Sequence, residues 1–157
     1  MRQVVKRIAA AGAVALCVIA AGCSKQQLAL EPSDTLAQLK GKITFTDQMT
    51  DMDSENTCRF YDIDTGMVAD SVSYVGSGAT AESMAVFEAV DADAAGSIAD
   101  ALQTFIDGWI AGYSDYKPEE VPKLESAVLE QNGVYVVFCV SADNTTAKTA
   151  VQDLLNP

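Results

Sequence analysis

Carboxylates and thiols are the side chains through which this sequence could do chemistry. The 157 residues include 22 Asp and Glu residues and four Cys but no His. Ser-His-Asp and Cys-His nucleophile systems and the common zinc sites use an imidazole, so these classes of site are excluded. No Cys-x-x-Cys pair occurs, which leaves a redox enzyme with little support. The spacing of the carboxylates and of the cysteines therefore decides which chemistry remains.

The carboxylates of Asp51, Asp53 and Glu55 are spaced like the start of a calcium-binding loop. Asn56, however, stands where such a loop needs Gly, and no bidentate Glu follows at its twelfth position. Capping of a short helix explains Asp53 as well. The same double interpretation applies to the acidic stretch that begins at Asp62, so the sequence predicts no metal site.

The other polar motifs each have a simpler structural explanation. Glu119 and Glu120 could form half of a glycosidase pair, but neighbouring glutamates in a Pro-bounded loop more often lie on the solvated surface. Residues 76–78, Gly-Ser-Gly, have no following Lys and are better explained as a turn than as a phosphate cradle. Trp109 could line a sugar site, but its helical spacing with apolar residues favours the core. The sequence therefore predicts no catalytic residue and no cofactor.

A basic head and an apolar run precede Cys23. Arg2, Lys6 and Arg7 come first, and residues 8–21 are small or apolar. As a helix these 14 residues would reach ~21 Å, short of the ~30 Å hydrocarbon layer. They suit the middle of a cleaved secretory signal, residues 1–22, better than a permanent membrane span.

The stretch Ala20-Ala21-Gly22-Cys23 resembles the lipobox of bacterial lipoproteins, with Ala20 where that family usually has Leu. The resemblance implies cleavage before Cys23, diacylglycerol on its sulfur and often a third acyl chain on the new amine. Residues 23–32 would then be a lipidated tether. Each buried methylene contributes about 0.8 kcal/mol, so two or three chains hold a domain at a membrane durably. The alternative is an ordinary cleaved signal that leaves Cys23 as a plain thiol.

The segment after the signal is strongly acidic. Cleavage before Cys23 leaves 135 residues, enough for one domain with a real core. They hold all 22 acidic residues but only seven of the ten basic ones, a formal charge of about −15. Such a surface repels nucleic-acid phosphates and anionic lipids, so nucleic-acid binding is excluded and membrane contact must come from the lipid.

Two cysteines remain in the expected domain, Cys58 and Cys139. An exported domain permits a disulfide between them. Two free thiols that serve as small apolar residues are the alternative. The sequence does not show whether the two residues meet, so both alternatives stay open.

Hydrophobic periodicity and capping residues predict an α+β domain over residues 33–157. The predicted helices span 33–40, 54–61, 65–70, 94–113 and 144–155. The predicted strands span 72–75, 84–90, 124–131 and 134–141, with an extended piece at 43–47 and an irregular segment at 117–123. Asn132-Gly133 between apolar strands predicts a hairpin, with both turn residues at positive φ. The long helix has one apolar stripe, which must cover a sheet. The expected fold is a small antiparallel sheet of about four strands with one long helix packed on it and short flanking helices.

Four stretches of the chain together resemble the domain of unknown function 4358, found in small lipoproteins of Gram-positive, mostly anaerobic bacteria. These stretches are residues 43–53, 61–68, 77–87 and 115–125. The resemblance extends over about residues 36–155. It implies a cell-surface lipoprotein and no known activity or catalytic residue, and Cys58 and Cys139 are not part of the family pattern.

These observations lead to one functional hypothesis with two alternatives. The sequence favours a lipoprotein that is anchored through Cys23 at the outer face of the cell membrane and acts as a binding or interaction module, not as an enzyme. One alternative is a carboxylate-based enzyme that acts on a substrate derived from the cell wall. The other is a solute-capturing accessory of a transporter.

Overall fold

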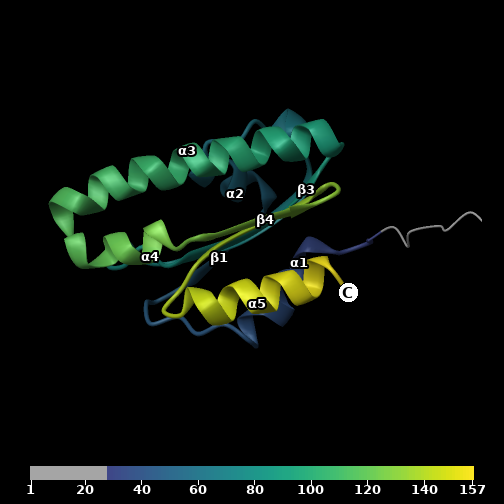
Figure 1. The fold of residues 1–157 in the computed structure, drawn as a ribbon. Coiled ribbons are helices and arrows are strands. Elements are labelled where there is room, and N and C mark those ends of the chain that lie inside the picture. The colour runs from purple at the N-terminus through teal and green to yellow at the C-terminus, as the bar shows by residue number, and fades with distance from the viewer. Residues whose placement is uncertain (1–27) are drawn as a thin grey trace, which may run out of the picture.

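The computed structural model describes residues 28–157, which form a five-stranded antiparallel sheet between two layers of helices (Figure 1). The expected signal segment 1–22, Cys23 and the first part of the expected tether 23–32 lie outside the described residues. The strand order is β1-β2-β3-β5-β4. The α+β class and the long packed helix are confirmed, with one strand more than expected.

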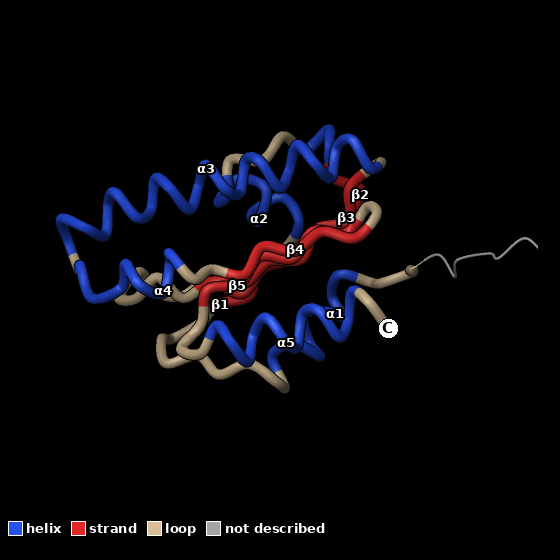
Figure 2. Tube along the Cα trace, viewed as in Figure 1, coloured by secondary structure: helices blue, strands red, loops and turns tan. Residues whose placement is uncertain are grey.

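The strands are short and the helices differ widely in length. The strands are β1 (Thr50–Met52), β2 (Val68–Val75), β3 (Ser83–Ala89), β4 (Val128–Asn132) and β5 (Tyr135–Val140). The helices are α1 (Pro32–Lys40), α2 (Ser54–Tyr61), α3 (Ala92–Tyr116), α4 (Val121–Glu125) and α5 (Asn144–Leu155). Two 3-10 turns complete the chain, η1 (Thr65–Met67) and η2 (Pro118–Glu120). Figure 2 shows α3 and α2 on one side of the sheet and α1 and α5 on the other.

The central strands are apolar on both faces because helices cover both. All six residues of β5 are buried. Alternate residues face opposite layers, so Phe138 packs in the cluster beneath α3 while Val137 packs in the cluster beneath α1 and α5. Two separate apolar cores therefore hold the sheet from its two sides.

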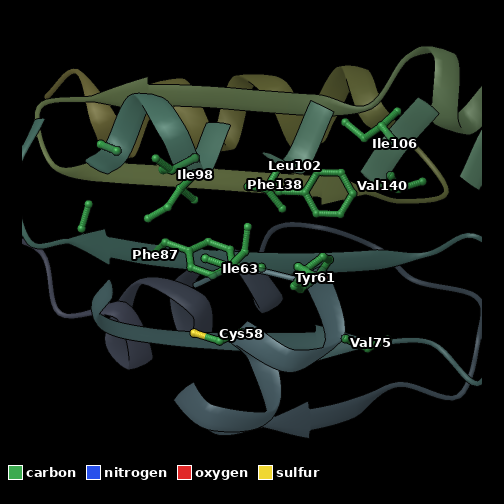
Figure 3. Packing of buried hydrophobic residues seen from close by; sticks show 14 of the residues in the cluster. Cys58, Tyr61, Ile63, Val75, Phe87, Ile98, Leu102, Ile106, Phe138 and Val140 are labelled. Atoms are coloured by element: carbon green, nitrogen blue, oxygen red, sulfur yellow. The ribbon is translucent and has the colours of Figure 1, made fainter. Parts of the chain in front are cut away.

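The long helix α3 contributes the largest apolar stripe. The Asp91 side chain accepts a hydrogen bond from the Ala94 amide at the N-terminus of the helix. Ile98, Leu102 and Ile106 are buried at steps of four residues, and Figure 3 shows them above the sheet. This stripe is the reason why α3 lies along the sheet instead of projecting from it.

Four predicted elements were wrong in detail. The helix predicted at 65–70 is only the 3-10 turn Thr65–Met67, because residues 68–70 already belong to β2. Residues 43–47 form no strand, and the three-residue β1 that follows was not expected. The strand predicted from residue 124 begins only at Val128, since Leu124 belongs to α4. The segment 117–123 contains η2 and α4, because Pro118 and Pro122 occupy first-turn positions, where a missing N–H costs a helix nothing.

The β4–β5 hairpin is confirmed, but its turn differs from the predicted one. Asn132 still pairs with Tyr135, so the two turn residues are Gly133 and Val134. Gly133 has φ +59°, and a Gly at the first turn position is the pattern of a type II′ connection. The side-chain amide of Asn132 instead donates a hydrogen bond to the Leu155 carbonyl oxygen at 2.6 Å. It thus satisfies a free carbonyl group at the C-terminal end of α5.

Two exposed glycines in α3 give a first test of the structure. A Cβ atom added at Gly108 or Gly112 would meet nothing within 4 Å. Gly108→Ala and Gly112→Ala should each raise the free energy of unfolding by about 0.5–1 kcal/mol, because Ala loses less backbone entropy in a helix. Urea unfolding of each variant checks this. Gly76→Ala is the opposite control, since its Cβ would meet Asp47 Oδ2 at 2.7 Å, and a gain in stability there would contradict the structure.

Candidate functional site

Three loops meet at the end of the sheet where β3 begins, and their polar side chains form the candidate site. The loops are residues 44–48, the β2–β3 loop 76–82 and the α3–α4 connection 117–123. Figure 2 shows loops gathering at the end of the sheet beside α4. We call the side chains that join these loops the carboxylate network. Its members are Thr46, Asp47, Ser77, Thr80, Glu82, Tyr113, Lys117, Glu120 and Lys123.

Glu82 is the centre of the carboxylate network. Its side chain is completely buried, yet it accepts hydrogen bonds from the Thr46 amide at 2.6 Å, the Thr46 hydroxyl at 2.7 Å and the Asp47 amide at 3.0 Å. Lys123 Nζ lies 3.4 Å from the same carboxylate. Burial raises the pKa of Glu82, but the donors at Thr46 and Asp47 together with Lys123 outweigh it and hold the pKa below its ordinary value. Glu82 therefore remains ionised inside the protein.

Glu120 is the second buried carboxylate, and Lys123 connects it to the first. Its Oε2 atom accepts from the Ala81 amide at 3.0 Å and lies 3.1 Å from Lys123 Nζ. The Lys123 side chain is 26% exposed, so one partly solvated ammonium group bridges two buried carboxylates. This bridge ties η2 and α4 to the last residues of the β2–β3 loop, directly before β3.

Asp47 holds the β2–β3 loop from the other side. Its carboxylate accepts from the Ser77 hydroxyl at 2.6 Å, the Thr80 hydroxyl at 3.0 Å and the amides of both residues at 3.1 and 3.2 Å. Burial acts to raise the pKa of Asp47, but the hydrogen bonds from Ser77 and Thr80 and a backbone bond lower it below its ordinary value. Gly76 is needed here because Asp47 and the Glu82 carbonyl approach its Cα too closely for a side chain.

Side chains at the C-terminal end of α3 bind backbone carbonyl groups of the same β2–β3 loop. The Tyr113 hydroxyl donates to the Thr80 carbonyl at 2.6 Å, and Lys117 Nζ donates to the Ala79 carbonyl at 2.5 Å. Tyr61 adds a contact from α2, since its hydroxyl is hydrogen-bonded to that of Ser83. The exposed residues 77–79 are thus held in one position by Asp47 of the 44–48 loop and by Tyr113 and Lys117 at the end of α3.

The carboxylate network is suited to positioning a loop and not to acid–base catalysis. Both Glu82 and Glu120 have donors on their carboxylates, and the lowered pKa of Glu82 makes it a poor proton donor. Among residues 28–157, no buried side-chain nitrogen or oxygen lacks a hydrogen-bond partner. In the same range, no three His, Cys, Asp or Glu side chains converge on a metal-sized site.

The residues proposed from the sequence as calcium ligands are dispersed. The Asp53 side chain caps α2 by accepting from the Asn56 amide at 3.0 Å. Asp51 forms an ion pair with Lys40, and Glu55 forms one with Arg59 at 3.2 Å. Helix capping, the alternative explanation, is what the structure shows for Asp53.

Glu119 and Glu120 separate into different environments. Glu119 is exposed, whereas Glu120 is 5% exposed and belongs to the carboxylate network. The expectation that both lie on the solvated surface was therefore wrong for Glu120, because α4 folds it back over the start of β3. Trp109 is half-buried and packs 4.5 Å from the Phe105 ring, in agreement with a core role.

The two cysteines of the described region lie on opposite faces of the sheet. Cys58 belongs to the cluster beneath α3, and Cys139 belongs to the cluster beneath α1 and α5. Both are buried and free, so of the two alternatives the structure has free thiols. Burial raises the pKa of the Cys139 thiol to about 12, which keeps it protonated at neutral pH.

An open groove of about 1150 Å³ lies at the opposite end of the sheet. Its lining comes from the residues before α1, the β4–β5 turn and the C-terminal residues. The lining includes Leu28, Leu30, Val134, Tyr135, Leu154 and Pro157.

No single motif in the sequence marks Glu82 or Thr46 as a site residue. Glu82 looks like an ordinary surface glutamate in the sequence, and its partners at residues 46 and 47 lie about 35 positions away. The signal that marks them is their place in the stretches 43–53 and 77–87, which resemble a family together with 115–125. The structure brings these three stretches into contact through the carboxylate network.

Neither the curated proteins nor the solved structures contain a match to the chain. A family model described as a domain of unknown function, DUF4358, matches residues 42–141. The match includes the whole sheet, α2 to α4 and the carboxylate network, while α1 and α5 lie outside it. Since it covers more than half of the sequence, the chain belongs to the DUF4358 family.

Proposed function

We propose that this protein is a lipoprotein anchored through acyl chains on Cys23 at the outer face of the cell membrane. The observation that carries the proposal is the sequence before Cys23, with its basic head, short apolar run and lipobox-like end. The fold is compatible with it, because Leu28, the first described residue, packs against the core beneath α1 and α5 and lies five positions after the proposed anchor. No helix within residues 28–157 is long and apolar enough to cross a membrane.

The domain outside the membrane acts as a binding or interaction module and not as an enzyme. The carboxylate network supports this part of the proposal, because its hydrogen bonds hold the exposed loop 77–79 in one position. Ordering a loop in advance reduces the entropy lost when a partner binds it. The acidic surface argues against nucleic acid as that partner.

Cys23→Ala tests the anchor. The variant should lose its acyl chains and move from the membrane fraction to the aqueous phase, because the domain has no other strong attachment. Detergent-phase partitioning and the intact mass of the purified protein measure both effects. Cys17→Ala is the matched control, since Cys17 lies in the segment that cleavage removes, and it should partition like the wild type. A purified protein that still begins at Met1, or that carries no fatty acid, would contradict the proposal.

A further inference from the structure

We infer that the domain stands on the membrane in one orientation, with the carboxylate network directed away from the lipid. The end that faces the lipid comprises residues 28–30, the turn residues 133–134 and residues 154–157, and we call it the anchor-side end. This inference rests on the lipid anchor at Cys23 proposed above. It assigns the anchor-side end to the lipid surface and leaves the exposed loop 77–79 free for a partner.

Residues 28–30, the first described residues, are held against the domain by specific contacts. The Leu30 amide donates to the Tyr135 hydroxyl at 3.1 Å, and Leu28 and Leu30 pack against the core beneath α1 and α5. Figure 1 shows the start of the described chain and the C-terminus at the same end of the molecule. The direction from which a tether reaches the domain is thus set by packing and not only by covalent connection.

The length of the tether limits how far the anchor-side end can be from the lipid. Five residue steps separate Cys23 from Leu28, and an extended chain spans at most ~3.4 Å per residue, so the gap is no more than about 17 Å. The length of β3 gives the distance between the anchor-side end and the end that carries the carboxylate network. It runs from Ser83, next to Glu82, to Ala89, whose amide donates to the Val134 carbonyl at 2.8 Å. At ~3.3 Å per residue, the two ends of the sheet lie roughly 20 Å apart.

The exposed charges at the anchor-side end are negative, so the covalent anchor, and not electrostatic attraction, must hold this end at the lipid. Glu31 and Asp153 are exposed there. The Glu130 carboxylate, nearby, accepts a hydrogen bond from the side-chain amide of Gln152. Carboxylates do not attract anionic lipid, so this end has no electrostatic affinity of its own for the membrane. The attachment should therefore be insensitive to high salt, unlike that of a basic patch.

The family match supports the same division of the molecule. Residues 42–141 contain the carboxylate network and the loop 77–79, whereas the segment 28–41 and α5, which build most of the anchor-side end, lie outside the match. The outward end therefore lies entirely within the part that this chain shares with its family, whereas only the turn residues 133–134 of the anchor-side end do.

Fluorescence quenching by labelled lipid tests the orientation. Pro157→Cys at the anchor-side end, Gln103→Cys midway along α3 and Ala79→Cys at the outward end each introduce one exposed thiol. The native Cys58 and Cys139 are 2% and 0% exposed, so a thiol-reactive fluorophore should label only the new site. The lipidated protein, cleaved before Cys23 and thus without Cys17, is reconstituted into phosphatidylglycerol vesicles that carry a nitroxide on the lipid headgroup. Quenching should be several-fold stronger at position 157 than at position 79, with position 103 between them.

The outcomes separate the orientation from the anchor. Equal quenching at the three positions, or the reverse order, in protein that floats with the vesicles would overturn the orientation and leave the anchor intact. Protein that carries no acyl chain and does not float with vesicles would overturn the anchor itself. Circular dichroism verifies that each variant is folded. If Pro157→Cys or Ala79→Cys does not fold, Asn156→Cys or Glu119→Cys, both at exposed positions, replaces it.

Discussion

Replacing Glu82 with Ala should lower the free energy of unfolding by roughly 3–5 kcal/mol, a large part of the ~5–15 kcal/mol typical of a domain. The substitution removes the acceptor for two backbone amides and one hydroxyl of the 44–48 loop. It also leaves Lys123 with only Glu120 as an ion-pair partner. Three hydrogen bonds and an ion pair to a completely buried carboxylate are lost together, so the loss exceeds the strength of any one bond. Urea unfolding measures it.

Two further variants and a pH series separate this effect from a simple loss of volume. Glu82→Gln keeps the shape and one acceptor and should cost less than Glu82→Ala, while Glu119→Gln, at an exposed position, should cost almost nothing. Because the folded pKa of Glu82 is below its ordinary value of 4.5, its charge stabilises the fold above that pH. The stability gap between wild type and Glu82→Gln should shrink as pH falls through the folded pKa. Equal stability of wild type and Glu82→Ala at neutral pH would refute the central role of this carboxylate.

Phe138→Ala should lower the free energy of unfolding by about 3–5 kcal/mol through a different mechanism, a cavity in the core beneath α3. Phe138 is completely buried in β5, and its ring lies 5.6 Å from that of Tyr61 and 6.4 Å from that of Phe105. Figure 3 shows it beside Leu102 and Ile106 of α3. Both helices on this face lose contacts when the ring is removed. Thermal and urea unfolding measure the effect.

Phe45→Ala is the matched control for this cavity. Phe45 is half-buried on the other side of the sheet and packs edge-to-face against Tyr74 at 5.6 Å. Because it is already partly solvated, its truncation removes less area from the core and should cost clearly less than Phe138→Ala. A larger loss at Phe45 than at Phe138 would mean that the main core lies elsewhere.

The separation of Cys58 and Cys139 has a consequence for how the fold is stabilised. The two thiols lie in different cores and form no disulfide. Segments far apart in the described sequence are therefore held together by the two apolar cores and by the carboxylate network. Stability should accordingly be unchanged by a reductant.

Local rules were sufficient for the helices and for the central strands. Caps at Asp53, Asp91 and Asp143 follow from side chains that reach amides two or three residues ahead, and they mark the starts of α2, α3 and α5. At α1 the rule failed, because neither Ser33 nor Asp34 caps the helix and Glu31 stands at the N-cap without a side-chain bond. The double-sided apolar character of β5 predicted its central place.

The sequence by itself determined the acidic charge, the α+β class, the caps of α2, α3 and α5 and the existence of the β4–β5 hairpin, since each depends on composition or on residues close together in the chain. Tertiary structure alone decided that β1 is a strand, since its three residues are ordered by pairing with β2. It also buried Glu82, which meets Lys123 only after folding brings the β2–β3 loop and α4 together, and it buried Glu120 against the Ala81 amide of the same loop. A carboxylate is stable in such a place only when donors from distant segments surround it, and no local pattern records where those donors will be.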